Sequence, residues 1–170
     1  MLTPQEQAGL IWMREEEKLA RDVYTALYDT WKAPIFNNIA TAEQTHTDAV
    51  KTLLNRYAID DPADGTAIGI FINPDIQALY TSLVSQGDES LVAALTVGAT
   101  IEDLDIADLQ ARATTTADIA LVYANLEKGS RNHLRSFSNQ LQASGATYTP
   151  THITPAAYDA IMSSGIERGA

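Results

Sequence analysis

The strongest constraint on the fold is the spacing of residues that start and end helices. Thr3, Pro4 and Glu6 form a typical helix start, because threonine caps the first turn, proline is favoured at the first helical position and the glutamate completes a capping box. Ala33-Pro34 ends that helix, and Gly145 ends the last long one. Apolar residues recur at helical spacing between these signals, and no segment alternates as a strand does.

These signals predict four long helices, at about residues 4–31, 36–57, 88–112 and 116–144, and short helices at about 74–86 and 155–163. The stretch AIDDPADGTAIGIFINPD, residues 58–75, separates the second long helix from the third and is long enough to be a crossover. Four long helices with a single long connection are typical of a ferritin-like four-helix bundle. We therefore expect one all-α, ferritin-like domain over residues 1–170, with short accessory helices.

Composition excludes several classes of function. The net charge of −11 at pH 7 argues against nucleic acid and against anionic membrane surfaces as partners. The chain has no cysteine, which excludes disulfides, zinc–thiolate sites, iron–sulfur clusters and thiol nucleophiles. No apolar run approaches the roughly 20 residues that span a bilayer, and no signal peptide begins the sequence. The sequence does not identify the compartment, and export after processing stays open. Formation of a homodimer stays open as well.

Ionisable residues interrupt the apolar face of every long helix. The inward-facing set comprises Glu43 and His46 in the second helix, Glu102 and Asp105 in the third, and Ser130 and His133 in the fourth. The first helix carries the run REEEKLARDVY, in which Glu16 is the most central by helical angle and Glu17 lies towards one side. We expect Trp12 and Trp31 to be packing residues.

A metal centre explains why these groups are buried. Several carboxylates and two imidazoles that meet in one core would strongly destabilise the fold without cations. Glu43 and His46 are three positions apart and therefore share a helix face, so Glu43 can bridge two ions while His46 binds one of them. Glutamates from facing helices would complete each coordination sphere. The pattern therefore predicts a dinuclear metal site.

The sequence resembles a ferritin-like family labelled domain of unknown function 2202. The segments that carry the resemblance are MREEEKLARDVY, FNNIATAEQTHTDAV, LTVGATIEDLDIADL and YANLEKGSRNHLRSF. More distantly, the site is similar to those of rubrerythrins and bacterioferritins, in which a first-helix glutamate precedes by seven residues a tyrosine near the metals. Glu17 and Tyr24 match this pattern, so the resemblance implies Glu17 as the first-helix ligand, with Glu16 as the alternative.

The fourth helix departs from the pattern of those diiron proteins. They usually carry Glu-x-x-His there, whereas this chain has Ser130-Arg131-Asn132-His133. Two arrangements stay open. Either Asp105 takes the place of the missing glutamate, or the site has five protein ligands: Glu17, Glu43, His46, Glu102 and His133.

A carboxylate and imidazole ligand set without sulfur suits two divalent ions, iron first, with manganese or zinc as alternatives. We therefore expect an oxidoreductase or ferroxidase-like protein that acts on dioxygen or peroxide. An external reductant is required, because a thiolate-bound electron-transfer centre needs cysteine. The competing hypothesis is a non-enzymatic bundle that binds metal for storage or structure.

Overall fold

The computed structural model describes residues 1–168, and within that range it contains six α-helices and no strand. The helices are α1 (Pro4–Trp31), α2 (Pro34–Arg56), α3 (Pro74–Gly87), α4 (Leu91–Ala111), α5 (Ala117–Ala143) and α6 (Pro155–Ser163). The prediction of an all-α fold is confirmed.

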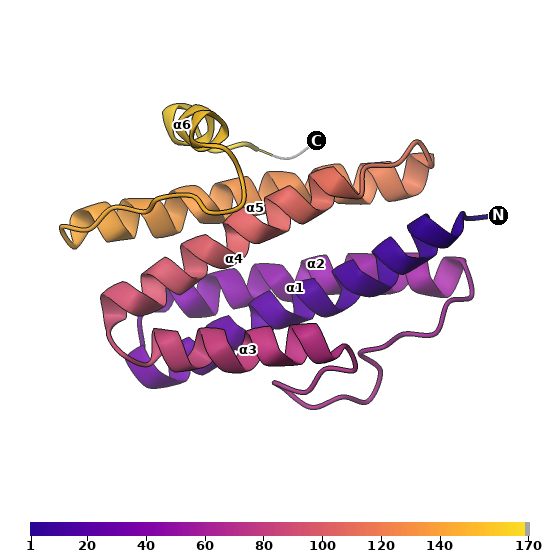
Figure 1. The fold of residues 1–170 in the computed structure, drawn as a ribbon, viewed down its shortest axis with the longest axis horizontal. Helices are drawn as coiled ribbons and strands as arrows, with labels where there is room; N and C mark the ends of the chain where they lie inside the picture. The colour runs from indigo at the N-terminus through magenta and orange to yellow at the C-terminus, as the bar shows by residue number, and fades with distance from the viewer. Residues whose placement is uncertain (169–170) are drawn as a thin grey trace.

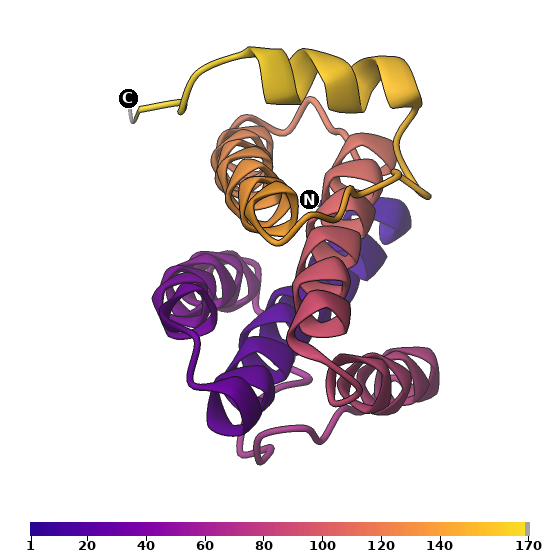
Figure 2. The ribbon, with the colours of Figure 1, turned by 90° about the vertical axis from the view of Figure 1, so that its left-hand side faces the viewer.

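The four long helices α1, α2, α4 and α5 pack side by side in a bundle (Figure 1). Short turns join α1 to α2 and α4 to α5, so each of these pairs is antiparallel. Helix α1 also contacts α4, and α5 also contacts α2, so the inner faces of all four helices meet (Figure 2). Helix α3 covers α1 and α4, and α6 lies across the outer side of α5.

Two helix starts differ from the sequence prediction. Helix α4 begins at Leu91 and not at residue 88, because the side chain of Ser90 caps it by accepting a hydrogen bond from the Ala93 N–H. Helix α2 begins at Pro34, since proline is well accommodated in the first turn of a helix. Both differences lie at helix ends, where capping residues decide the boundary.

An apolar core fills the bundle. Tyr24, Phe36 and Phe137 come from three helices and pack against one another with tilted rings, whose centroids are 5.3–6.5 Å apart. Gly98 of α4 allows this packing, because a side chain there would overlap the ring of Phe137. Every helix within residues 1–168 is too short or too polar to span a bilayer.

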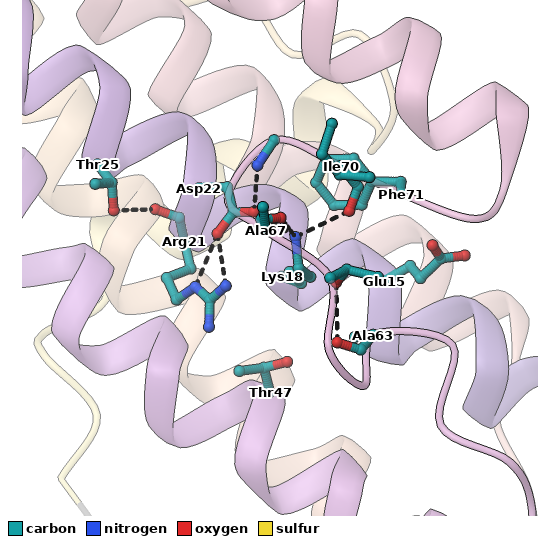
Figure 3. Close-up of polar contacts among 12 residues, drawn as sticks. Glu15, Lys18, Arg21, Asp22, Thr25, Thr47, Ala63, Ala67, Ile70 and Phe71 are labelled. Carbon is teal, nitrogen blue, oxygen red and sulfur yellow. Dashed lines mark hydrogen bonds and ion pairs between the residues drawn. The ribbon is translucent and has the colours of Figure 1, made fainter.

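Buried charged side chains of α1 hold the crossover, the segment between α2 and α3, against the bundle (Figure 3). Lys18 Nζ donates hydrogen bonds to the carbonyl oxygens of Ala67 at 2.9 Å and Ile70 at 3.1 Å, and it pairs with Asp22 at 2.6 Å. Asp22 also accepts a hydrogen bond from the backbone N–H of Gly69. These contacts satisfy loop backbone groups that have no helical partner.

The same side of α1 binds both ends of the crossover. Arg14 pairs with Asp61 at 2.9 Å near its start, and Glu15 accepts hydrogen bonds from the backbone N–H groups of Ile72 at 2.6 Å and Asn73 at 3.1 Å near its end. The charged run of α1 therefore has two roles. Part of it binds the crossover, and its two remaining glutamates are buried between the long helices.

Candidate metal centre

Five of the six predicted ligands converge in the middle of the bundle. They form two groups in which the ligand atoms lie within 4.8 Å of one another. The groups are Glu17, Glu43 and His46, and Glu43, Glu102 and His133. We refer to these five residues as the cluster. Each of the four long helices contributes at least one member.

Glu43 is common to both groups and lies between the two histidines. Its Oε2 is 2.7 Å from Nδ1 of His46, and its Oε1 is 2.7 Å from Nδ1 of His133. Each imidazole also faces a second glutamate: His46 Nδ1 is 3.4 Å from Glu17 Oε2, and His133 Nδ1 is 3.5 Å from Glu102 Oε2. The cluster therefore contains two matching half-sites that share one carboxylate.

The carboxylates are almost completely buried, whereas the imidazoles reach the edge of the bundle. Glu17, Glu43 and Glu102 are each 2 % exposed. The side chains of His46 and His133 are 14 % and 13 % exposed, and their rings stack with centroids 5.6 Å apart. The cluster is therefore closest to solvent between α2 and α5, on which these two histidines lie.

Several polar atoms of the cluster are buried without a hydrogen-bond partner among the described residues. They are Glu17 Oε1, Glu43 Oε1 and His133 Nδ1. Glu43 Oε1 and His133 Nδ1 lie 2.7 Å apart, yet their geometry is not that of a hydrogen bond. This arrangement is expected of two atoms that bind the same metal ion. Three carboxylates and two imidazoles with unsatisfied atoms fit hard or borderline divalent cations. The residues present therefore fit a pair of metal ions.

The electrostatics of the metal-free chain show how these charges balance. Burial raises the pKa of Glu17 to about 7 and also raises the pKa of Glu102. Burial alone would raise the pKa of Glu43 too, but the neighbouring His133 and His46 hold it well below its usual range. Desolvation lowers the pKa values of both histidines, yet attraction to Glu43 outweighs this and raises them to about 12 for His46 and about 10 for His133. Two imidazolium charges thus compensate the buried carboxylates of the cluster.

Two neighbouring residues position ligands of the cluster. Tyr24 donates a hydrogen bond of 2.6 Å from its hydroxyl to Oε1 of Glu102, which leaves Oε2 to face His133. Gly129 of α5 makes room for His46, because a Cβ there would lie 2.5 Å from Cε1 and 2.6 Å from Nε2 of that ring. Gly129 is not among the residues predicted from the sequence. A glycine inside a helix, close in sequence to His133, is the signal that would have revealed it.

Asp105, the sixth predicted ligand, lies outside both groups. Its Oδ2 accepts a hydrogen bond from the hydroxyl of Ser130, and its buried Oδ1 has no hydrogen-bond partner within residues 1–168. Burial, together with repulsion from Glu17 and Glu16, raises the pKa of Asp105 well above its usual range. Asp105 therefore lies beside the cluster, hydrogen-bonded to Ser130 of α5.

Glu16 and Glu17 are both buried but face different partners. Glu17 belongs to the cluster. Glu16 instead accepts a hydrogen bond at Oε2, 2.5 Å from Nε1 of Trp12, and the same indole nitrogen lies 2.8 Å from Oδ2 of Asp108. Trp12 packs against the apolar core, as expected, and its indole N–H also contacts two carboxylates. Trp31 likewise donates to a backbone carbonyl, that of Gly87.

Known proteins similar to this chain share its whole length. The family profile described as "Uncharacterized protein domain (DUF2202)" matches residues 6–165. The protein called "Uncharacterized protein MJ0754" of Methanocaldococcus jannaschii is 56 % identical over 170 residues, which cover 99 % of this chain and 92 % of that protein. A crystal structure of hypothetical protein MJ0754 from Methanococcus jannaschii is 55 % identical, with a TM-score of 0.97 over 98 % of this chain and 97 % of that one.

Proposed function

This chain belongs to the DUF2202 family, and we propose that it is a ferritin-like dinuclear metal protein with oxidoreductase or ferroxidase-like activity towards dioxygen or peroxide. The metal ions would be iron, with manganese or zinc as alternatives. The observation that carries the proposal is the position of Glu43, whose two oxygens each lie 2.7 Å from a different histidine. A carboxylate placed in this way is suited to bridging two ions.

The ligands divide into two sets. Glu17, His46 and one oxygen of Glu43 would hold one ion, and Glu102, His133 and the other oxygen of Glu43 would hold the second. Two redox-active divalent ions held there would supply two electrons in total, which together with two protons reduce dioxygen to hydrogen peroxide or hydrogen peroxide to two waters. The surrounding residues exclude bulk water from the carboxylates, and Tyr24 keeps Glu102 oriented through its hydrogen bond. Burial and repulsion from Glu17 and Glu16 raise the pKa of Asp105, whose Oδ2 accepts a hydrogen bond from Ser130 in the wall of the site.

The order and direction of the helices support the ferritin-like part of the proposal. Two antiparallel pairs, α1 with α2 and α4 with α5, are joined by the crossover and α3, which return the chain to the end of the bundle where α4 begins (Figure 1). A bundle with one long connection between its second and third long helices has this topology.

One observation favours a second candidate, a non-enzymatic metal-binding bundle. Ser130 replaces the expected glutamate and engages Asp105, so only Glu43 is placed to bridge. Five protein ligands then hold two ions, which suits retention of metal without rapid turnover. This candidate shares the metal site with the first and differs from it only in reactivity.

One experiment distinguishes the candidates. The metal-free protein is loaded anaerobically with two equivalents of Fe(II) and then mixed with dioxygen or peroxide in a stopped-flow spectrometer. Rapid oxidation with a transient absorbing species supports the oxidoreductase. Stable, unreactive binding supports the second candidate, and the absence of binding refutes both. Glu43→Gln should abolish binding, whereas Glu127→Gln, which removes a charge paired with Arg131 outside the cluster, should leave binding unchanged.

A further inference from the structure

A groove of about 930 Å³ opens at the end of the bundle where α1 begins. It lies between the first turns of α1, the turn that joins α4 to α5, and the beginning of α5. The residues that matter most for its chemistry are Gly9, Trp12, Arg112, Ile119 and Tyr123. Its volume lies in the range typical of small-molecule sites.

Trp12 connects this groove to the metal centre. Its indole lines the groove, and its Nε1 contacts Glu16 at 2.5 Å and Asp108 at 2.8 Å. Glu16 is the sequence neighbour of Glu17, a member of the cluster, and Asp108 is one helical turn from Asp105 in the wall of the cluster. The groove therefore approaches the metal centre to within about one turn of helix along both α1 and α4.

The groove combines flat apolar surfaces with hydrogen-bond donors. The guanidinium carbon of Arg112 lies 5.0 Å from the centre of the Trp12 ring. Among the described residues Arg112 contacts Asp108 through Nη1, with a hydrogen bond to its carbonyl oxygen and an ion pair of 3.0 Å to its carboxylate, and Nη2 is left to donate to a ligand. Burial raises the pKa of Tyr123 to about 12, so its hydroxyl stays protonated and can donate. Because residue 9 is glycine, this hydroxyl has no side chain between it and the start of α1. These features suit a planar aromatic ring that carries oxygen acceptors.

We propose that this groove binds the external reductant, a small aromatic hydroquinone, and that Trp12 is the contact through which its electrons reach the metal centre. The inference rests on the proposed redox function, which needs a reductant because the chain has no cysteine to hold a redox centre of its own. The hydroquinone loses two electrons and two protons and leaves as the quinone. The electrons would reduce two trivalent metal ions held by the cluster to the divalent state, and the protons would pass to water in the groove. No bond of Trp12 forms or breaks.

Binding is tested on the metal-free chain, with menadione as the probe and calorimetry as the readout. We expect saturable binding at one site. Ala113→Trp, which fills the groove from an exposed position in its wall, should weaken binding at least tenfold. Asn139→Trp, in a separate groove between the start of α2 and α5, is the matched control and should bind as the wild type does. Absence of binding, or an equal effect of both substitutions, overturns the assignment.

Electron transfer is tested with the iron-loaded, oxidised protein under anaerobic conditions. Menadiol should reduce the wild type at least ten times faster than Trp12→Phe or Ala113→Trp, whereas dithionite, which does not need the groove, should reduce all three at one rate. Equal menadiol rates overturn the role of Trp12. If the protein oxidises iron but does not bind menadione, this inference alone is refuted. If it binds menadione but never binds iron, both the proposed function and the role of the groove as a reductant site are refuted.

Discussion

Gly129→Ala should separate metal affinity from stability. In a helix interior this change normally stabilises a protein by about 1 kcal/mol. Here the new Cβ would lie 2.5 Å from Cε1 and 2.6 Å from Nε2 of His46. The ring must move by roughly 1 Å to regain an ordinary contact of about 3.5 Å. Metal–ligand distances tolerate only about 0.2 Å, so His46 would no longer bind its ion well.

In Gly129→Ala we expect the ion beside His133 to bind with wild-type affinity and the ion beside His46 to bind with about 10–100-fold lower affinity. A loss of this size is usual when a residue that positions a metal ligand is changed. The melting temperature of the metal-free protein should change by no more than about 4 °C, because the gain in helix stability and the displacement of the ring oppose each other. Gly9→Ala is the matched control, since its Cβ meets Tyr123 at 3.3 Å, away from the cluster. Calorimetric titration with Fe(II) or Zn(II) measures both affinities. Two sites of wild-type affinity in Gly129→Ala would refute the reasoning.

Three further predictions follow from the electrostatics. Metal binding at pH 7 should release at least two protons. His46 and His133, with pKa values of about 12 and about 10, release one each, and Glu17, with a pKa of about 7, adds a further fraction. Titrations in buffers of different ionisation enthalpy measure this release, and a buffer-independent heat would contradict it. Glu102→Gln should stabilise the metal-free protein and weaken metal binding, because burial raises the pKa of Glu102 and so disfavours its charged form. As pH falls from 7 towards about 5, Glu102 of the wild type takes up a proton, and the wild type should become as stable as the variant. Melting temperatures of both proteins against pH measure this. Asp103→Asn should cost about 1–3 kcal/mol at pH 7, because that carboxylate accepts hydrogen bonds from Tyr148 and from three consecutive backbone N–H groups. These bonds lower the pKa of Asp103, so its contribution is present above about pH 4 and is lost as pH falls further, and denaturant unfolding at pH 7 and pH 3 tests it.

The helices were predictable because their signals are local. The proline and threonine caps and the apolar period identify all six, and the errors lie at ends such as the start of α4, where Ser90 and not Asp88 provides the cap. The inward position of Glu43 and His46 was equally readable, because i and i+3 residues share a face of any helix.

The rest depends on contacts between segments far apart in sequence. Helical angles favour Glu16 over Glu17, yet both glutamates are buried, and it is Glu17 that joins the cluster while Glu16 contacts Trp12. The partner of Asp105 is Ser130, on another helix, and no spacing in the sequence records that hydrogen bond. The partners of Lys18 are backbone carbonyls of the crossover, whose path has no periodicity to read.

The central claim is that Glu43 joins two metal ions. The most direct test is a crystal structure of the Fe(II)-loaded protein, with anomalous diffraction recorded at the iron edge. Two anomalous peaks should appear, one beside each Glu43 oxygen, each about 2.0–2.2 Å from a carboxylate oxygen of Glu43 and from the nearer histidine nitrogen. A single peak, or iron bound away from Glu43 with the two histidines still paired to it, would contradict the account.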